Sequence, residues 1–221
     1  MRVEICANSY PSAIAAQNGG AHRIELCTAL SVGGLTPSRD LIRKTMAALA
    51  IPVHVLVRPR SGDFCYSEEE LATMLQDIEF YKEVGCSGVV SGVLTSEGDV
   101  DAIATKRLIN MASGMHFTFH RAFDEVLDPQ KSLLQLIDLG ADRILTSGQQ
   151  PSAIKGLSLL KKLLKISEAT IEIMPGAGIT SKNAMLFKEA GFPSIHLSAT
   201  LGNPEGHSDQ KEIESVVSLV S

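Results

Sequence analysis

The sequence lacks several features that would mark a particular class of protein. Its 221 residues include no tryptophan, and only 5% of them are aromatic. No apolar run approaches the roughly 20 residues of a membrane-spanning helix, so we expect no membrane partner. The formal net charge is -5 at pH 7, which argues against a nucleic-acid partner because nucleic-acid-binding surfaces are basic.

Cysteine is scarce, and its spacing excludes a C-x-x-C metal or redox motif. The four cysteines are Cys6, Cys27, Cys65 and Cys86. The first ten residues, MRVEICANSY, lack the basic segment and long apolar core of a signal peptide. We therefore expect reduced thiols in a cytoplasmic protein. Cys86, in a predicted helix-to-strand turn, is expected to be structural, whereas Cys65 lies in a loop and could add a third thiol to a site.

Short β-rich runs alternate with amphipathic stretches along the whole chain. The expected strands are Val3–Cys6, Arg23–Cys27, Val53–Arg58, Gly88–Leu94, His116–His120, Arg143–Ser147, Ile171–Met174 and Ser194–Ser198. Several intervening helices are predicted to end at a glycine, as in DPQKSLLQLIDLG at Gly140. About eight βα units without a shift in composition predict an α/β fold, a short (β/α)₈ TIM barrel in one domain over 1–221. A doubly wound open sheet is the alternative, but no G-x-G-x-x-G follows the first expected strand.

The alternation within each strand predicts which side chains enter the barrel. Residues i and i+2 share a face, and the apolar face should lie under the helices. The inward polar set then comprises Glu4, Glu25, Glu172, His54, His120, His196, Arg58, Cys6 and Cys27. RVEIC and RIELC are near copies 21 residues apart, so pairing in equivalent register would make Cys6 and Cys27 neighbours. Such a polar interior is either a network of buried ion pairs or a binding site at the carboxyl ends of the strands.

Seven motifs, in order along the chain, resemble the CutC family of copper homeostasis proteins. They are VEICANS, RIELCTALSVGGLTPS, IPVHVLVRPRSGDFCYS, FTFHRAFDEVLDP, DRILTSGQ, IMPGAGI and IHLSA, and the resemblance covers about 2–199. It implies a (β/α)₈ barrel, a cytoplasmic location and a role in copper handling. Two cysteines implicated in Cu(I) binding in that family match Cys6 in EICAN and Cys27 in ELCTA. The family usually continues after IHLSA with an arginine, a longer loop and a final helix, whereas the tail here, 200–221, is shorter.

The first function to consider is Cu(I) binding by thiols at the barrel mouth. Cu(I) is a soft ion that prefers thiolate ligands. Cys6 and Cys27 are the expected metal ligands, and Met174 and His196 lie on strands that could place them across the mouth. The alternative is that buried free cysteines act only as small hydrophobic residues.

The second function is an enzyme that acts on a small anionic molecule, such as a phosphorylated metabolite. Buried carboxyl and imidazole groups acquire shifted pKa values suited to acid–base chemistry, so the catalytic candidates are Glu25, His54 and His120. The ligand-binding candidates are Arg58, Arg60, Arg121, Asp124, Gly176, Gly178, His196 and Ser198. Asp124 could instead form a salt bridge to Arg121 or cap a turn. No lysine lies on an expected strand, which disfavours Schiff-base chemistry.

A third possibility is a barrel that serves only as a binding or scaffold protein. Substitutions should distinguish the first two functions. A copper carrier would need the thiols and tolerate loss of His120, whereas an enzyme would need His54, His120 and Arg58 and could tolerate Cys→Ser. In each case we expect a homodimer, the commonest assembly of soluble proteins.

Overall fold

The computed structural model describes residues 1–203 and 206–221. The strands are β1 (Arg2–Ala7), β2 (Arg23–Leu26), β3 (Val53–Leu56), β4 (Gly88–Ser91), β5 (His116–Phe119), β6 (Arg143–Thr146), β7 (Glu172–Pro175) and β8 (Ser194–Leu197). The α-helices are α1 (Tyr10–Asn18), α2 (Arg39–Ala48), α3 (Glu68–Glu83), α4 (Ala102–Met111), α5 (Pro129–Leu139), α6 (Leu157–Ser167), α7 (Ala184–Glu189) and α8 (Gln210–Val220). Two short 3₁₀ turns, Leu30–Val32 and Arg121–Glu125, follow β2 and β5.

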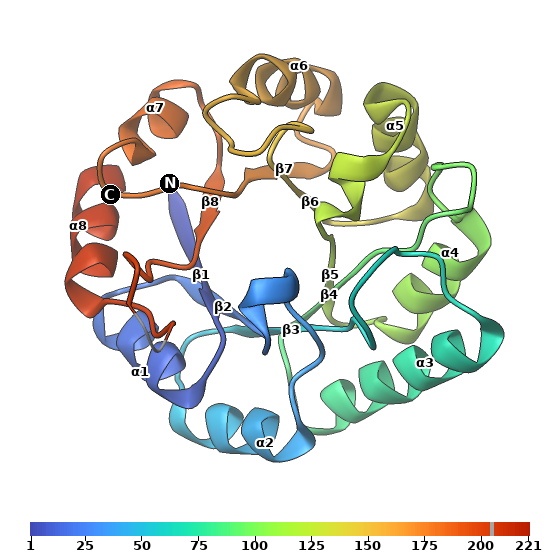
Figure 1. The fold of residues 1–221 in the computed structure, drawn as a ribbon, viewed down its shortest axis with the longest axis horizontal. Coiled ribbons are helices and arrows are strands. Elements are labelled where there is room, and N and C mark those ends of the chain that lie inside the picture. The colour runs from blue at the N-terminus through green and yellow to red at the C-terminus, as the bar shows by residue number, and fades with distance from the viewer. Residues whose placement is uncertain (204–205) are drawn as a thin grey trace.

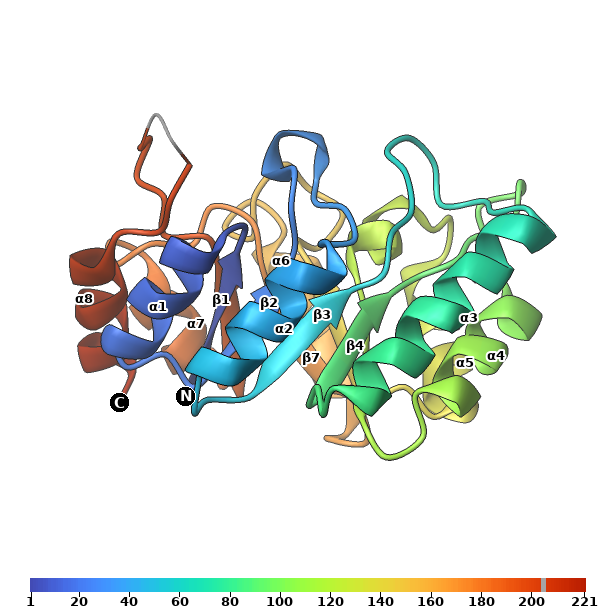
Figure 2. The ribbon, with the colours of Figure 1, turned by 90° about the horizontal axis from the view of Figure 1, so that it is seen from below.

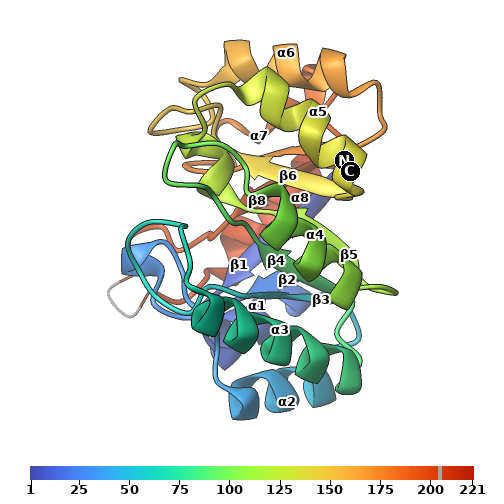
Figure 3. The same cartoon turned by 90° about the vertical axis from the view of Figure 1, so that its right-hand side faces the viewer.

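The strands form one parallel sheet that curls into a barrel. Their order is β7-β6-β5-β4-β3-β2-β1-β8, and β7 meets β8 at a parallel bridge between Gly176 and His196. The helices form a ring outside the strands (Figure 1). The loops after β2 and β3 stand above one end of the barrel (Figure 2), and the same loops project from that end in the third view (Figure 3). The expected (β/α)₈ barrel is therefore confirmed, and the open sheet is not formed.

Two expected strands end at least two residues earlier than their sequence pattern indicates. β3 ends at Leu56 rather than Arg58, and β4 ends at Ser91 rather than Leu94. The Val57 amide still donates to the Val90 carbonyl at 2.8 Å, whereas the Leu94 amide turns to Phe64 of the loop after β3. The segments that follow β3 and β4 therefore leave the hydrogen-bonded sheet and form loops at the mouth of the barrel, although their apolar sequence pattern continues.

Local capping explains where the helices begin and end. Ser67 accepts from the Glu70 amide while the Glu70 side chain accepts from the Ser67 amide, a reciprocal cap that starts α3. Asp128 caps α5 by accepting from the amides of Gln130 and Lys131, and Gly140 ends this helix at φ +85°, as expected from the sequence. A residue with a Cβ atom is strained at that angle, so glycine is favoured there.

The strand faces point as the alternation predicts. Val3, Ile5 and Ile24 are fully buried in the layer between the sheet and the helices. Glu4 and Glu25 point the other way and are buried inside the barrel. Period-2 alternation therefore assigned the faces correctly.

The pairing of β1 with β2 is offset by two residues from the equivalent register. Cys6 pairs with Glu25, and Glu4 pairs with Arg23. Strands in a closed barrel are tilted and staggered, and an offset of two keeps every side chain on its own face. The thiols of Cys6 and Cys27 nevertheless meet, because both lie on the inner face on diagonal positions.

The barrel interior has a charged layer beneath a smaller apolar layer. In the lower layer Arg23 contacts both Glu4 and Glu172, and Arg143 donates to Glu172 at 2.7 Å and to Thr118 at 3.0 Å. The upper layer contains Cys6, Cys27, Leu56 and Val90. Arg23 and Arg143 thus complete the ion pairs that keep the buried carboxylates charged.

None of the helices in the described part of the chain is both long and apolar enough to span a bilayer.

Candidate functional site

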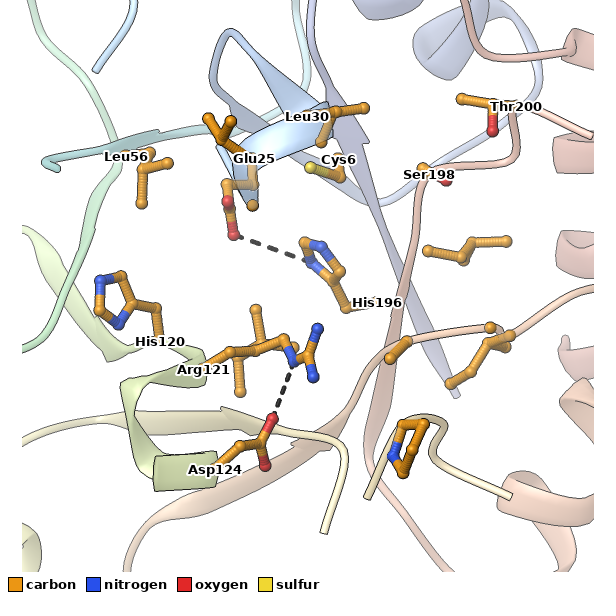
Figure 4. Close-up of a pocket in the computed structure, with 18 of the residues that line it drawn as sticks. Cys6, Glu25, Leu30, Leu56, His120, Arg121, Asp124, His196, Ser198 and Thr200 are labelled. Atoms are coloured by element: carbon orange, nitrogen blue, oxygen red, sulfur yellow. Dashed lines mark hydrogen bonds and ion pairs between the residues drawn. The ribbon is translucent and has the colours of Figure 1, made fainter. Parts of the chain in front are cut away.

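A pocket of about 700 Å³ opens at the carboxyl ends of the strands. Figure 4 shows side chains from β1, β2, β3 and β8 and from the mouth loops converging on it. The predicted site residues that line this pocket are Cys6, Glu25, Arg58, His120, Arg121, Asp124, Gly178, His196 and Ser198. The active sites of TIM barrels lie at this end of the fold.

Glu25 is the most unusual carboxyl group of the pocket. Its side chain is buried, and its Oε2 atom has no hydrogen-bond partner. Burial, together with the nearby Glu4 and Cys27, raises its pKa to about 8, although His196 works in the opposite direction. At neutral pH the free protein therefore keeps the Glu25 carboxyl largely protonated, which makes it a proton donor.

His196 is held in place by a buried carboxylate. Its Nδ1 atom lies 2.8 Å from Glu4 Oε1 and 3.8 Å from Glu25 Oε2. Burial alone would raise the pKa of Glu4, but Arg23 and His196 hold it well below its usual value. Burial likewise opposes a charged imidazole, yet the hydrogen bond to Glu4 and the charges of both carboxyl groups raise the pKa of His196. The pair fixes the ring and leaves its Nε2 atom free of the Glu4 contact.

The two expected metal ligands are in direct contact. Cys6 Sγ lies 3.5 Å from Cys27 Sγ; Cys6 lines the pocket, while Cys27 is fully buried behind it. The contact with Cys27, followed by burial, raises the pKa of Cys6 well above its usual value. A metal–thiolate bond of about 2.3 Å allows two sulfur ligands to be at most about 4.6 Å apart. The separation therefore suits one ion shared by both sulfurs, provided that the ion displaces their protons.

His120 presents a buried, neutral imidazole. Its Nδ1 atom accepts from the Ala122 amide at 3.2 Å, so the proton lies on Nε2, which has no partner. Burial, then the charge of Arg58, lowers its pKa to about 3. The ring packs against Phe64 at 4.9 Å between centroids. His120 can therefore donate a hydrogen bond from Nε2 but is a poor base at neutral pH.

Arg58 binds two mouth loops together. Its guanidinium donates to the carbonyls of Val32, Gly34 and Gly62 and stacks over Phe64. Within residues 1–203 and 206–221 it has no carboxylate partner within 4.0 Å. Its charge is thus balanced only by carbonyl dipoles, which leaves the wall of the pocket positive near His120.

Arg121 and Asp124 contact each other at the rim. Arg121 Nε donates to Asp124 Oδ2 at 2.8 Å. Asp124 also accepts from Thr146 Oγ1 at 2.5 Å and from the amides of Ser147 and Gln149. These donors occupy the Asp124 oxygens, as expected for a salt bridge to Arg121 and a turn cap.

Besides Cys27, three predicted site residues do not line the pocket. Arg60 turns to Glu70 at 2.6 Å and to the Cys65 carbonyl, away from the mouth. His54 lies deeper in the barrel, 3.9 Å from Glu4 and stacked on His116. Gly176 packs under Leu145, where an added Cβ would lie 2.6 Å from the Leu145 Cδ1 atom.

Sequence reasoning did not name several residues that shape the site. Arg23 and Arg143 neutralise the buried acids, and both occupy the first position of an inward-facing alternation, in RIEL and RILT. The period-2 rule could have found them. Phe64, which contacts both Arg58 and His120, belongs to a loop without a periodic signal.

A parallel barrel with a polar pocket at the carboxyl ends of its strands defines a TIM-barrel protein with a mouth site. The CutC family model matches residues 1–201, and the chain belongs to the CutC family. A family protein CutC of Pasteurella multocida is 47% identical over 199 residues, which cover 90% of this chain and 82% of the relative. Its counterpart in Bacteroides fragilis (strain YCH46) is 46% identical over 198 residues, 89% of this chain and 79% of the relative.

Solved structures support the same fold. A candidate copper homeostasis protein CutC from Streptococcus agalactiae superposes with a TM-score of 0.85 at 34% identity, covering 90% of this chain and 98% of that one. Thiamine phosphate pyrophosphorylase from Pyrococcus furiosus reaches 0.67 at 16% identity, covering 99% and 95% of the two chains. The second likeness concerns the barrel fold alone.

Proposed function

We propose that the protein binds Cu(I) through Cys6 and Cys27 and takes part in copper homeostasis. The observation that carries this proposal is the 3.5 Å contact between the two sulfur atoms at the floor of the pocket. Thiolates are the preferred ligands of a soft monovalent ion, and a digonal bis-thiolate site needs no further donor. The name of the Streptococcus agalactiae structure is consistent with this role.

The compartment proposed for this activity is the cytoplasm. All four cysteines are free thiols in the structure, and a reducing compartment keeps thiols in that state. The expected homodimer stays a prediction, to be measured by size-exclusion chromatography with light scattering.

Anaerobic titration with Cu(I) against a chromophoric chelator tests the copper proposal. Wild type should withdraw one equivalent of Cu(I) from the chelator, and Cys6→Ser and Cys27→Ser should each lose that ability. Cys65→Ser is the matched control, because Cys65 lies in the loop after β3 and does not line the pocket. Binding that persists in both single variants would rule out the thiol pair as the site.

The second candidate function is an enzyme acting on a small anionic molecule at the same mouth. A cavity of about 700 Å³ is far larger than a metal ion and lies within the usual size range of small-molecule sites. It contains a protonated carboxyl at Glu25 and a free donor at His120 Nε2, beside the positive guanidinium of Arg58. These groups could donate protons and hydrogen bonds to an anionic substrate.

A thermal-shift screen of phosphorylated and carboxylated metabolites tests the enzyme candidate. A true ligand should raise the midpoint of wild type, and the rise should disappear in His120→Ala. His116→Ala is the matched control, since His116 begins the strand that leads to His120 and has an exposed side chain at the opposite end of the barrel. An equal rise in all three proteins would place the ligand elsewhere.

A further inference from the structure

Three different metal-binding side chains meet on adjacent strands of the pocket floor. Cys6 comes from β1, Glu25 from β2 and His196 from β8, and one potential ligand atom of each lies within 4.8 Å of the others. All three side chains are buried, and Figure 4 shows them pointing toward one another. This group differs from the thiol pair, because it includes an oxygen and a nitrogen donor and leaves out Cys27.

An unpartnered atom in this group points to a missing cation. Glu25 Oε2 has no hydrogen-bond partner although the side chain is only 5% exposed. Buried polar atoms without a partner are rare in folded proteins and call for an explanation. His196 Nδ1 lies 3.8 Å from Glu25 Oε2, a distance too long for a hydrogen bond. This nitrogen contacts Glu4 Oε1 at 2.8 Å instead. A cation between Glu25, Cys6 and His196 would satisfy the free oxygen.

Glu4 supports His196 in the manner typical of metal-bound histidines. It contacts His196 Nδ1 at 2.8 Å, and Arg23 in turn binds Glu4. A carboxylate behind one ring nitrogen sets the tautomer and directs the other nitrogen to the metal. The contact with Glu4 occupies Nδ1 of His196 and leaves Nε2 as the ring nitrogen without that contact.

We propose that Cys6, Glu25 and His196 form a site for a divalent cation of the zinc type, with its fourth position open to the pocket. One sulfur, one oxygen and one nitrogen donor suit an ion of borderline softness better than Cu(I). Zinc bonds of about 2.0–2.3 Å place two ligands at most about 4.6 Å apart, so small side-chain rotations close the site. Three protein ligands and one open position are the pattern of catalytic zinc.

The open position faces the pocket of about 700 Å³. A small molecule bound there would place a carbonyl, hydroxyl or carboxylate oxygen on the ion. The substrate class is therefore an oxygen-bearing small molecule that the cation polarises. This inference goes beyond copper binding, and the two proposals share only Cys6.

Titration with Zn²⁺ under anaerobic conditions tests the site. Metal-free protein competes with a chromophoric zinc chelator, and Co²⁺ serves as a spectroscopic probe of thiolate ligation. We expect one equivalent of Zn²⁺, an affinity loss of about 100-fold in Glu25→Gln and in Cys6→Ser, and loss of the sulfur-to-Co²⁺ charge-transfer band in Cys6→Ser alone. Cys65→Ser is the matched control and should bind as wild type.

Cys27→Ser separates this site from the copper pair. It should abolish tight Cu(I) binding while changing zinc affinity less than threefold. Zinc binding that is lost in Cys27→Ser, or unchanged in Glu25→Gln, would overturn the proposed ligand set. Circular dichroism checks that each variant is folded. If Glu25→Gln does not fold, Glu25→Asp replaces it, because this variant keeps a carboxylate on a shorter side chain. Glu25→Asp should weaken zinc binding, and a zinc affinity equal to that of wild type would likewise refute the role of Glu25.

Discussion

The sulfur atoms of Cys6 and Cys27 lie 3.5 Å apart although the two residues are not paired across their strands. Cys6 is opposite Glu25, so Cys27 sits one inward-facing position further along the chain, directly after the end of β2. This stagger brings a carboxyl and a thiol to the same side of Cys6. One residue thereby belongs to both the thiol pair and the mixed-ligand group of the pocket floor.

Removal of the Glu4 charge should strongly destabilise the protein. Glu4 is fully buried and contacts Arg23 and His196, so Glu4→Gln leaves His196 without its closest carboxylate and Arg23 with Glu172 as its remaining one. Breaking a buried ion pair from one side costs about 3–5 kcal/mol. Urea unfolding at pH 7 measures the loss. Glu69→Gln, at an exposed position of α3, should change stability by less than about 0.5 kcal/mol. Equal effects of the two changes would contradict the role of Glu4.

The protonated Glu25 should make stability fall as pH rises. Its pKa is raised from 4.5 to about 8 in the fold, chiefly by burial, so the folded state binds an extra proton between these values. The unfolded state binds fewer protons there, and stability decreases by up to about 1.4 kcal/mol per pH unit from this group. Urea unfolding of metal-free wild type and Glu25→Gln from pH 5 to 8 should show this slope only in wild type. Glu83→Gln, an exposed exchange, is the control. Parallel pH profiles of wild type and Glu25→Gln would refute the shift.

His120 should have the opposite pH dependence. Burial lowers its pKa from 6.5 to about 3, so below pH 6.5 the unfolded chain binds a proton that the folded chain does not. Stability therefore falls as pH decreases from 6.5 toward 3, by up to about 1.4 kcal/mol per unit. Denaturant unfolding of His120→Gln should show a shallower acid limb than wild type. His116→Gln, at an exposed position, is the control for this prediction. An equal flattening of the acid limb in His116→Gln would argue against His120 as the group responsible.

Gly92 should be needed for the position of the His120 ring. A Cβ at residue 92 would lie 2.7 Å from His120 Nδ1 and 3.1 Å from the Phe119 ring. Gly92→Ala should displace the imidazole and cost about 1–3 kcal/mol through overpacking. A double-mutant cycle with His120→Ala measures the coupling. The cost of Gly92→Ala should drop by at least about 0.5 kcal/mol once the ring is absent. Strict additivity would show that the clash lies elsewhere.

Part of the site could be read from local patterns. The alternation in RVEIC and RIELC correctly placed Glu4, Cys6 and Glu25 inside the barrel, because strand geometry alone sends alternate residues to opposite faces. The rule does not extend to Arg60, which follows the end of β3 and turns to Glu70. Once a chain leaves its strand, its side chains follow loop contacts that have no period.

By itself the sequence determined the alternation of strands and helices, the faces of the strands and the family of the protein, since all three depend on short-range patterns and motifs. Only the tertiary structure decided the stagger between β1 and β2 and the contact between Glu4 and His196, which are 192 residues apart. The stagger is a property of the whole closed sheet, because the tilt that closes a barrel is distributed over all of its strands. The grouping of Cys6, Glu25 and His196 follows from that closure, which brings the last strand beside the first.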